Sequence, residues 1–521
     1  MQDVTPTFKA HAVQDTTKPV AQLLVSWLKQ FDPDIVFFTI GVSTIGGTDP
    51  IKGERNTISS FDQYEYVDES AHLLDLTVER QTNEPIYSAA RAIADLELEN
   101  TGQRFTPDSD PTIGSYIKPK RPVRIYLGFD REPQEKIQIF VGELSEFPLV
   151  DNRRMTVNMS AIDFANTIWN VPLEETQIYL DKRSDELIEI LLQAAGFSGD
   201  NYELDTGLNT IAFAYFKKGQ KIGEIIEKIC EAELAVFYAD ENGTFRFENL
   251  FHYNNPPHDV SVLTITDDIV LEEKQPDVKK IVNVAEITAH PRSQKSNQVI
   301  WRLPSAIQIS SGQTYEFFID YDDPIVTIDT PAGYGSHTSS YFRANTASDE
   351  SGLDVTADFL VSDFTNFAEA SKLSITNNSG AVAYLTAVEI WGTPAKKVFG
   401  EGGLYYRYQD DTSVAEYEEN VATIDNDFIQ NTSFANSISQ FLVNQRKDAN
   451  DYLELTVRGQ PHLQIGDLVT RNSLTYYINR IVTKLNASDG LIQELVLVSR
   501  NISDYFTIGV STIGGVDIIA P

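Results

Sequence analysis

The chain has 521 residues, more than a single hydrophobic core organises, so about two to four domains are expected. Hydrophobic residues make up 41% and charged residues 22%, which is typical of a folded protein and excludes a wholly disordered one. The formal net charge of −35 excludes a protein that binds nucleic acid or anionic membranes through its overall charge, because such a surface repels phosphates.

Cysteine content and hydropathy exclude further classes of protein. Cys230 is the only cysteine, so a disulfide framework and a cysteine-based metal site are excluded. It lies on the apolar side of the helical pattern IGEIIEKICEAEL, which predicts a buried, unreactive thiol. The start of the chain lacks the layout of a signal peptide, and no apolar run approaches the roughly 20 residues that cross a bilayer. We expect a soluble protein made in the cytoplasm, without stable membrane insertion.

Residues 20–140 read mainly as strands. AHLLDLTVERQ alternates with period two, and a strand at Ala94–Leu98 leads into a long loop rich in turn residues. VRIYLGF, QIFVGELSEFP and MTVNMSAID follow as further strands joined by short turns. This order predicts an antiparallel sheet or a small barrel.

From Asp181 onward the hydrophobic period becomes that of a helix. In DKRSDELIEILLQAAGF, Ser184 is expected as the N-cap and Gly196 as the residue that ends the helix. A second helix around Cys230 runs into a hairpin that turns at Glu241-Asn242-Gly243. The segment predicts a compact α+β unit.

The remainder of the chain returns to β structure. Residues 276–400 contain many short strands with turn signals between them, which indicates a sandwich. NDFIQNTSFANSISQFLVNQRKD has the pattern of an amphipathic helix, and the strands after it include a Gly-Asp turn.

No pattern in the sequence indicates catalysis or metal binding. His252 and His258 lie in a proline-rich loop without further ligands, so we predict no metal site there. Ser43 and Ser511 lie in Gly-Val-Ser-Thr-Ile-Gly, one residue too long for a nucleophile elbow, and no helix follows either copy. The Gly-rich stretch at 46–53 lacks the order of a phosphate-binding loop. We expect no enzyme activity and no cofactor, although acidic pairs among 76 acidic residues leave a glycosidase open.

A series of short motifs runs along the chain in a constant order. The first group consists of Leu98, Asn100, Phe105, Thr106 and Pro107, then Pro119, Arg121, Pro122, Val123, Arg124 and Ile125, then Phe140, Gly142, Ala161 and Asp163. AYLTAVEIWGTPA follows later, and the last group comprises Gly459, Pro461, Leu463, Gly466, Asp467 and Val469. In this order the motifs resemble those of tail-tip or baseplate hub proteins of tailed bacteriophages, over most of residues 60–500.

The resemblance implies a multidomain, mainly β fold with an α+β insert, β-barrel-like tube-forming domains and a β-sandwich insertion. The expected domains are an N-terminal arm at 1–57, a first β-barrel-like hub domain at 58–172, an α+β domain at 173–262, a β-sandwich-like domain at 263–405, a second β-barrel-like hub domain at 406–503, and a C-terminal arm at 504–521.

The resemblance also implies a structural protein of the virion tail, assembled in the host cytoplasm. It implies a homotrimer that continues or closes the tail tube, anchors the tip or central fibre, and lets the genome pass. The implied partners are distal tail or tail-tube ring proteins, the tape-measure protein and the central fibre or tip protein, with DNA only as passing cargo. An acidic lumen would repel the phosphates of that DNA.

Two other functions stay open at this point. A carbohydrate-binding, host-recognition tail protein would use aromatic residues of the sandwich region as a platform. These aromatics are Tyr315, Phe317, Tyr334, Tyr341 and Trp391, and the sequence favours a place in the sandwich core for them over a glycan platform. A polysaccharide-degrading tail enzyme would use acidic pairs instead.

One segment occurs twice, as FTIGVSTIGGTD from Phe38 and as FTIGVSTIGGVD from Phe506. Its apolar residues alternate and are interrupted by glycines, which suits a strand that bends sharply. We predict that each copy adds a strand to an exposed sheet edge of a neighbouring subunit or partner ring. The expected assembly contacts are Phe38, Ile40, Val42, Ile45, Phe506, Ile508, Val510 and Ile513.

Overall fold

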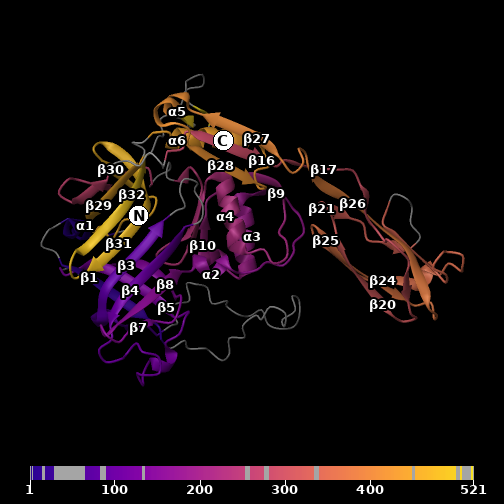
Figure 1. The fold of residues 1–521 in the computed structure, drawn as a ribbon, viewed down its shortest axis with the longest axis horizontal. Coiled ribbons are helices and arrows are strands. Elements are labelled where there is room, and N and C mark those ends of the chain that lie inside the picture. Colours follow the sequence, from indigo (N-terminus) through magenta and orange to yellow (C-terminus); the bar gives the residue numbers. More distant parts are fainter. Residues whose placement is uncertain are drawn as a thin grey trace.

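The computed structural model shows a broad body with one elongated β unit that projects from its side (Figure 1). The structure describes residues 2, 4–13, 18–27, 65–81, 90–131, 135–252, 258–274, 281–333, 339–448 and 452–499, and two short strands near the end of the chain. Those two strands are β33 (Tyr505–Phe506) and β34 (Ile518–Ile519), which pair in parallel. Among the described residues, no helix has the length and apolar character that crossing a membrane requires.

The N-terminal part of the chain builds what we call the first half of a 14-stranded sheet. Its alternating strands bury one row of side chains in a core that includes Leu76, Leu96, Ile125 and Phe140. A short helix, α1 (Pro6–Ala12), packs on it through Phe8. The strands are β1 (Pro19–Val25), β2 (Val67–Asp68), β3 (Leu73–Gln81), β4 (Arg91–Glu99), β5 (Pro122–Phe129), β6 (Lys136–Leu144), β7 (Leu149–Asp151) and β8 (Thr156–Asp163).

The C-terminal part builds the second half of the same sheet around a separate core. The two halves join where β3 pairs antiparallel with β31, from Asp75 opposite Asn486 to Gln81 opposite Arg480. Residues far apart in sequence therefore form one continuous sheet. The strands of the second half are β14 (Leu263–Thr264), β15 (Val270–Lys274), β29 (Tyr452–Arg458), β30 (Leu468–Arg471), β31 (Leu474–Asn486) and β32 (Gly490–Ser499).

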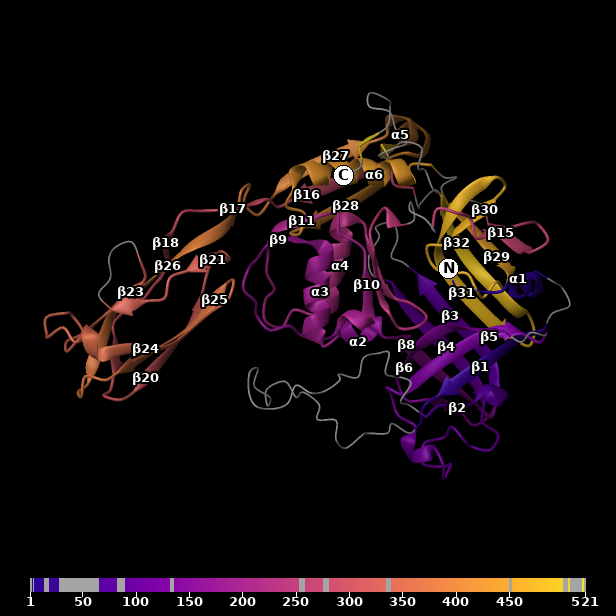
Figure 2. The same cartoon turned by 180° about the vertical axis from the view of Figure 1, so that it is seen from behind.

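The α+β insert lies between the sheet and the projecting unit (Figure 2). Gly196 ends α3 with φ 101°, as predicted, but Ser184 is the first helical residue and Arg183 is the N-cap. Cys230 is fully buried in α4, and burial raises the pKa of its thiol, as expected for an unreactive cysteine. The elements are α2 (Ala165–Trp169), β9 (Tyr179–Arg183), α3 (Ser184–Ala195), β10 (Tyr202–Leu204), β11 (Thr210–Ala214), α4 (Ile222–Glu233), β12 (Val236–Ala239) and β13 (Phe245–Glu248).

A three-stranded sheet carries the predicted amphipathic helix and links the insert to the projecting unit. β16 (Val284–Ala289) pairs antiparallel with β27 (Leu404–Gln409) and parallel with β28 (Val421–Asn426). The helix α6 (Thr432–Arg446) packs on β16 and β27, and the Asn431 side chain caps its first turn. The short helix α5 is Asp411–Tyr417.

The projecting unit is a two-sheet sandwich with its own core, in which Phe317, Leu373 and Ile390 are buried. Its strands are β17 (Arg292–Gln294), β18 (Gln298–Arg302), β19 (Ile307–Ile309), β20 (Thr314–Asp320), β21 (Ile325–Ile328), β22 (Ala332–Gly333), β23 (Tyr341–Asn345), β24 (Phe359–Asn366), β25 (Ala370–Asn377) and β26 (Ala383–Lys397).

The expected fold class is confirmed, because the chain is multidomain and mainly β with an α+β insert. Within 263–405, the range expected to form one sandwich-like domain, the strands divide between four sheets. β14 and β15 join the 14-stranded sheet, β16 and β27 join the sheet under α6, and β17 to β26 form the two sheets of the sandwich.

Candidate functional site

The doubled segment is the site that the sequence predicts, and most of it lies outside the described residues. Phe506 is described only through its backbone, in β33. The other predicted contacts fall in the undescribed part of the chain, namely Phe38, Ile40, Val42, Ile45, Ile508, Val510 and Ile513. Ser43 and Ser511 lie there too. The role of the segment in assembly stays a prediction.

The described residues do show how the chain is held on both sides of residues 28–64, the arm that carries the first copy of the segment. β1 and β2 pair antiparallel, with Val25 opposite Val67, so the chain leaves and re-enters the sheet at neighbouring points. Trp27 is fully buried and its Nε1 donates to Glu69 Oε1 at 2.8 Å. Arg104 reaches the same buried carboxylate, with Nη2 at 2.7 Å from Oε1. A buried, hydrogen-bonded ion pair therefore anchors the base of this arm.

The first family motif builds the loop that delivers Arg104. Asn100 is 3% exposed, and its Oδ1 accepts a hydrogen bond from the Phe105 N–H at 2.9 Å. Its Nδ2 donates to Thr106 Oγ1 at 3.0 Å. Phe105 is fully buried with its ring centroid 6.1 Å from that of Trp27. The motif residues thus shape the loop and supply core, with no reactive group among them.

Gly142 and Asp163 hold the strands of the first half together. They lie opposite each other in β6 and β8, and a Cβ on Gly142 would lie 2.1 Å from the Ile162 carbonyl oxygen. The Asp163 carboxylate accepts from the Ala92 N–H at 2.7 Å and so joins the end of β8 to β4. Burial raises the pKa of Asp163 to about 6, against the lowering effect of that hydrogen bond.

The last motif shapes the turns of the second half. A Cβ on Gly459 would lie 2.1 Å from Leu491 Cγ, so only glycine fits without displacing that side chain. Asp467 is 6% exposed and its Oδ2 accepts from the Gln464 N–H at 2.9 Å. Burial raises the pKa of Asp467 to about 6. As in the first half, the motif residues determine backbone geometry.

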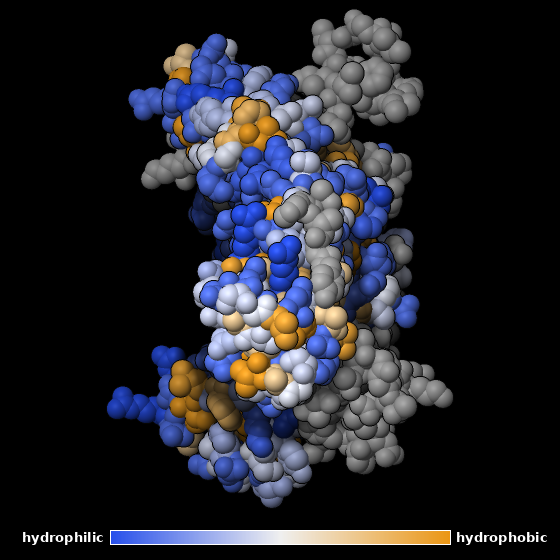
Figure 3. Space-filling model, turned by 90° about the vertical axis from the view of Figure 1, so that its right-hand side faces the viewer, coloured by the Kyte–Doolittle hydropathy of each residue, from blue (hydrophilic) through white to orange (hydrophobic). Residues whose placement is uncertain are grey.

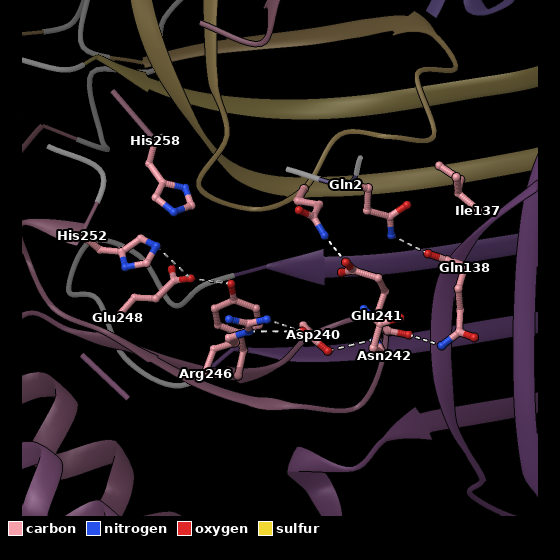
Figure 4. A pocket seen from close by; sticks show the side chains of 12 residues that line it. Gln2, Ile137, Gln138, Asp240, Glu241, Asn242, Arg246, Glu248, His252 and His258 are labelled. Carbon is pink, nitrogen blue, oxygen red and sulfur yellow. Dashed lines mark hydrogen bonds and ion pairs between the residues drawn. The ribbon is translucent and has the colours of Figure 1, made fainter. Parts of the chain in front are cut away.

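The tip of the β12–β13 hairpin connects the α+β insert to both halves of the sheet (Figure 4). Glu241 is 4% exposed, and its Oε2 lies 2.9 Å from Arg80 Nη1 of β3. Its Oε1 accepts a hydrogen bond from Gln464 of the second half, and its carbonyl accepts one from Gln138 of β6. One residue of the predicted hairpin turn therefore joins three parts of the fold.

A pocket of about 480 Å³ opens beside this joint, and Figure 4 shows its polar lining. His252 Nδ1 lies 2.8 Å from Asp205 Oδ2, and its Nε2 lies 3.5 Å from Glu248 Oε1. Burial alone would lower the pKa of His252, but the two carboxylates raise it overall. The ring of His258 lies tilted against that of His252, with the two centroids 4.3 Å apart. Burial, and then the charge of His252, lowers the pKa of His258.

The carboxylates of this pocket already have partners within the protein. Asp240 Oδ2 lies 3.0 Å from Arg246 Nη2, and Glu248 Oε1 accepts from the Tyr238 hydroxyl at 2.7 Å. The arrangement suits a structural polar joint better than acid–base chemistry. Across the described residues, no group of three or more His, Cys, Asp or Glu side chains is placed to hold a metal ion.

A second hollow, which we call the acidic groove, lies on the solvent face of the first half. It measures about 370 Å³ and its lining includes Asp75, Asp95, Glu97 and Glu146. Asp75 lies directly opposite Glu97 across β3 and β4, a like-charge pair that opposes folding. Burial, and then the charge of Glu97, raises the pKa of Asp75. The acids are thus held together against their mutual repulsion.

The sandwich aromatics divide between core and surface. Phe317 and Tyr341 are buried at 6% and 9% exposure, Trp391 is half-buried, and Tyr315 is 40% exposed. Tyr334 lies outside the described residues. The most exposed apolar residues of this unit are instead Phe318, Leu353 and Leu360, at 78%, 75% and 58%. Figure 3 views the molecule from this side and shows apolar patches between polar ones.

Sequence reasoning missed Arg80, Gln464, Trp27 and Glu69 as functional positions. Their importance lies in contacts between segments up to hundreds of residues apart, for which a single sequence carries no local pattern. The hairpin at Glu241-Asn242-Gly243 was predicted, and Gly243 has φ 87° there, but the partners of Glu241 were not.

No protein-family model and no curated protein matches the chain. Among solved structures, it is similar to the 43 kDa tail protein of prophage MuSo2 from Shewanella oneidensis, at 11% identity and a TM-score of 0.44, covering 84% of this chain and 96% of that chain. A tail protein from Neisseria meningitidis MC58 gives 9% identity and a TM-score of 0.44, covering 84% and 94%. Prophage tail protein gp18 from Listeria monocytogenes EGD-e gives 8% and 0.38, covering 84% and 92%.

These similar structures are tail proteins by name, the class that the sequence motifs resemble. Because their TM-scores are below 0.5, we build the proposed function on the chain's own residues.

Proposed function

We propose that this chain is a structural protein of a phage tail, the hub of its tip or baseplate. The observation that carries the proposal is the pairing of β3 with β31, which joins an eight-stranded half and a six-stranded half from opposite ends of the chain into one sheet. In a homotrimer, three chains with two halves each supply six sheet halves in a closed ring. That number suits the end of a hexameric tail tube, which the motif resemblance implies.

The hub continues or closes the tube and seats the tip or central fibre. Its partners are the distal tail or tail-tube ring proteins, the tape-measure protein and the fibre or tip protein. The doubled segment supports this role, because two copies per chain give six identical contacts per trimer. Its residues from Phe38 and from Phe506 would add strands to sheet edges of these neighbours.

The acidic groove supports passage of the genome through the ring. Asp75, Asp95 and Glu97 share the solvent face of the sheet, and a lumen lined by this face would repel DNA phosphates. DNA is then a passing cargo that slides without docking.

The first test is the assembly state of the purified full chain. Mass photometry is expected to give a trimer, and co-expression with a tail-tube ring protein is expected to give a larger complex. Deleting Phe506 to Pro521 should leave the far-UV circular dichroism and the thermal unfolding temperature unchanged but prevent tail assembly. A persistent monomer together with normal tails from the deletion variant would refute the hub.

We do not propose glycan binding or glycan hydrolysis. Phe317 and Tyr341 of the expected aromatic platform serve the sandwich core. The carboxylates of the larger described pocket are engaged by Arg246 and Tyr238.

A further inference from the structure

β20 is the outer strand of the three-stranded sheet β20-β25-β24 in the sandwich. On one side it pairs with β25, from Thr314 opposite Thr376 to Asp320 opposite Ala370, without a register shift. On the other side no strand of the described residues pairs with it. Its burial pattern leaves five of its seven residues exposed. Its outer backbone N–H and C=O groups are therefore open to a further strand.

Two other edge strands of the described sheets, β24 and β15, have features that discourage pairing. β24 is interrupted by a register shift between Val361 and Asp363. β15 has a shift of its own and carries Glu272, Glu273 and Lys274. Charges and bulges of this kind are the usual protection of an edge.

One further edge is occupied by another element. Beside β28 the Asn426 side chain donates to the Lys228 carbonyl of α4 at 2.8 Å, so that helix covers the edge. β20 is thus a long edge with neither a bulge nor a covering element.

The side chains of β20 favour an uncharged, partly apolar neighbour. Phe318 is 78% exposed and Tyr315 is 40% exposed, so both faces of the edge offer apolar contact area. β20 contains two acids: Glu316 has its Oε1 2.9 Å from Lys372 Nζ of β25, and Asp320 is the last residue of the strand. An incoming strand therefore meets little net charge along most of this edge.

We propose that the outer edge of β20 binds the doubled segment FTIGVSTIGG of a second copy of this chain by strand addition. This inference rests on the proposed function, because it assigns one binding site to the doubled segment whose residues are the predicted assembly contacts. The segment contains no charged residue, so it approaches a chain of net charge −35 without the repulsion that other surfaces of a second copy would meet.

The lengths and patterns of the two strands correspond. Phe506 to Ile513 spans eight residues against seven in β20. Phe506, Ile508 and Val510 alternate as the residues of an added strand must, and Ile513 falls outside that alternation. The sandwich projects from the body, so β20 is accessible to another copy (Figure 2). Each chain offers one β20 edge and two copies of the segment, so one copy per chain remains for a partner ring.

Cysteine cross-linking between full-length chains tests this directly, because the native Cys230 is fully buried and gives little background. One chain carries Phe318→Cys on β20, and a second carries Val510→Cys in the segment. Mixed under oxidised glutathione, they are expected to form a disulfide-linked heterodimer. Because each chain has one introduced cysteine, this product reports contact between copies only.

The matched control is Leu360→Cys on β24, the opposite edge of the same sheet and 58% exposed. We expect its heterodimer with Val510→Cys at background level. Equal yields from both edges, or no product from Phe318→Cys, would overturn the assignment of β20. The deletion of Phe506 to Pro521 distinguishes a failure of this inference from a failure of the proposed function. If the deletion impairs tail assembly but Phe318→Cys gives no cross-link, the β20 assignment is wrong and the hub proposal stands. If the deletion variant assembles normal tails, the hub proposal itself is wrong.

Discussion

Glu241 and Arg80 form a buried ion pair, with Oε2 2.9 Å from Nη1, between the hairpin of the α+β insert and β3 of the 14-stranded sheet. The side chains are 6% and 13% exposed. β3 is also the strand that joins the two halves of the sheet, through its pairing with β31. The pair therefore fixes the insert at the junction on which the proposed ring depends.

Replacing Glu241 by Ala should destabilise the protein by about 3 kcal/mol, because Arg80 would stay buried without its counter-charge. The loss is measured by urea unfolding of the full chain. As a control, Glu286→Ala breaks the pair with the more exposed Arg407 and should cost less than about 1 kcal/mol. Equal losses in both variants would show that the joint contributes no more than a surface pair.

The fold class was predictable because it depends on periodicity within each segment. The helix around Cys230, the helix of 432–446 and the turn before Gly243 are all encoded by neighbouring residues. The pairing of β3 with β31 was not predictable, since alternation defines a strand but not its partner. The doubled segment was visible from sequence alone. Its proposed binding site was not, because that site depends on which sheet edges the fold leaves unpaired.

The error at Ser184 has a specific physical cause. The Arg183 backbone is extended, at φ −73° and ψ 160°, so Arg183 is the N-cap, and its N–H donates to Glu186 Oε2 at 2.9 Å. The Ser184 hydroxyl is used elsewhere, donating to Glu233 Oε2 at 2.8 Å. A tertiary contact with a buried carboxylate thus replaced the local cap that the sequence suggested.

Glu233 should make stability depend on pH between about 4.5 and 7. Burial raises its pKa from 4.5 to about 7, although Asn209 N–H and the Ser184 hydroxyl lower it. The folded state therefore binds a proton that the unfolded state releases. Its stabilising contribution is complete below pH 4.5, falls as the pH rises, and is lost above about 7, for a change of about 3 kcal/mol.

Glu233→Gln should remove the part of this pH dependence that lies between about pH 6 and 7, because the amide oxygen still accepts the same hydrogen bonds and no longer titrates. Asp163 and Asp467, whose pKa burial raises to about 6, keep a dependence at lower pH. Urea unfolding at pH 4.5, 6 and 8 measures it. In Ser184→Ala one donor to the carboxylate is lost, so the slope should extend to higher pH. An unchanged slope in Glu233→Gln would assign the pH dependence to other groups.

The two close-packed glycines should respond differently to a compensating change. Gly142→Ala and Gly459→Ala each place a Cβ 2.1 Å from a neighbouring atom, so each should destabilise by more than about 2 kcal/mol. For Gly459 that neighbour is the Leu491 side chain, so Leu491→Ala in the same chain should recover part of the loss. For Gly142 it is the backbone carbonyl of Ile162, and Ile162→Ala should recover none.

Thermal unfolding of the four single and two double variants, compared as two double-mutant cycles, decides the point. Rescue of Gly142→Ala by Ile162→Ala would mean that a side chain sets the limit at both sites. Failure to rescue Gly459→Ala would mean that the Leu491 side chain is not what limits the space beside Gly459.

Reversing the charge of the acidic groove should slow the passage of DNA without preventing assembly. Asp95 and Glu97 project from β4 on the solvent face, and Asp75 lies opposite Glu97, so Glu97→Lys replaces a repulsive pair with an attractive one. Phage carrying Asp95→Lys and Glu97→Lys should therefore assemble normally. Their lumen would bind phosphates, and genome ejection in vitro should slow by about two- to tenfold at low salt.

The slowing of ejection should become smaller as ionic strength rises, because salt screens the added contacts. Glu272→Lys on the exposed edge strand β15 is the matched control and should eject at the normal rate. An unchanged ejection rate in the double variant, with intact tails, would place the acidic groove outside the path of the DNA.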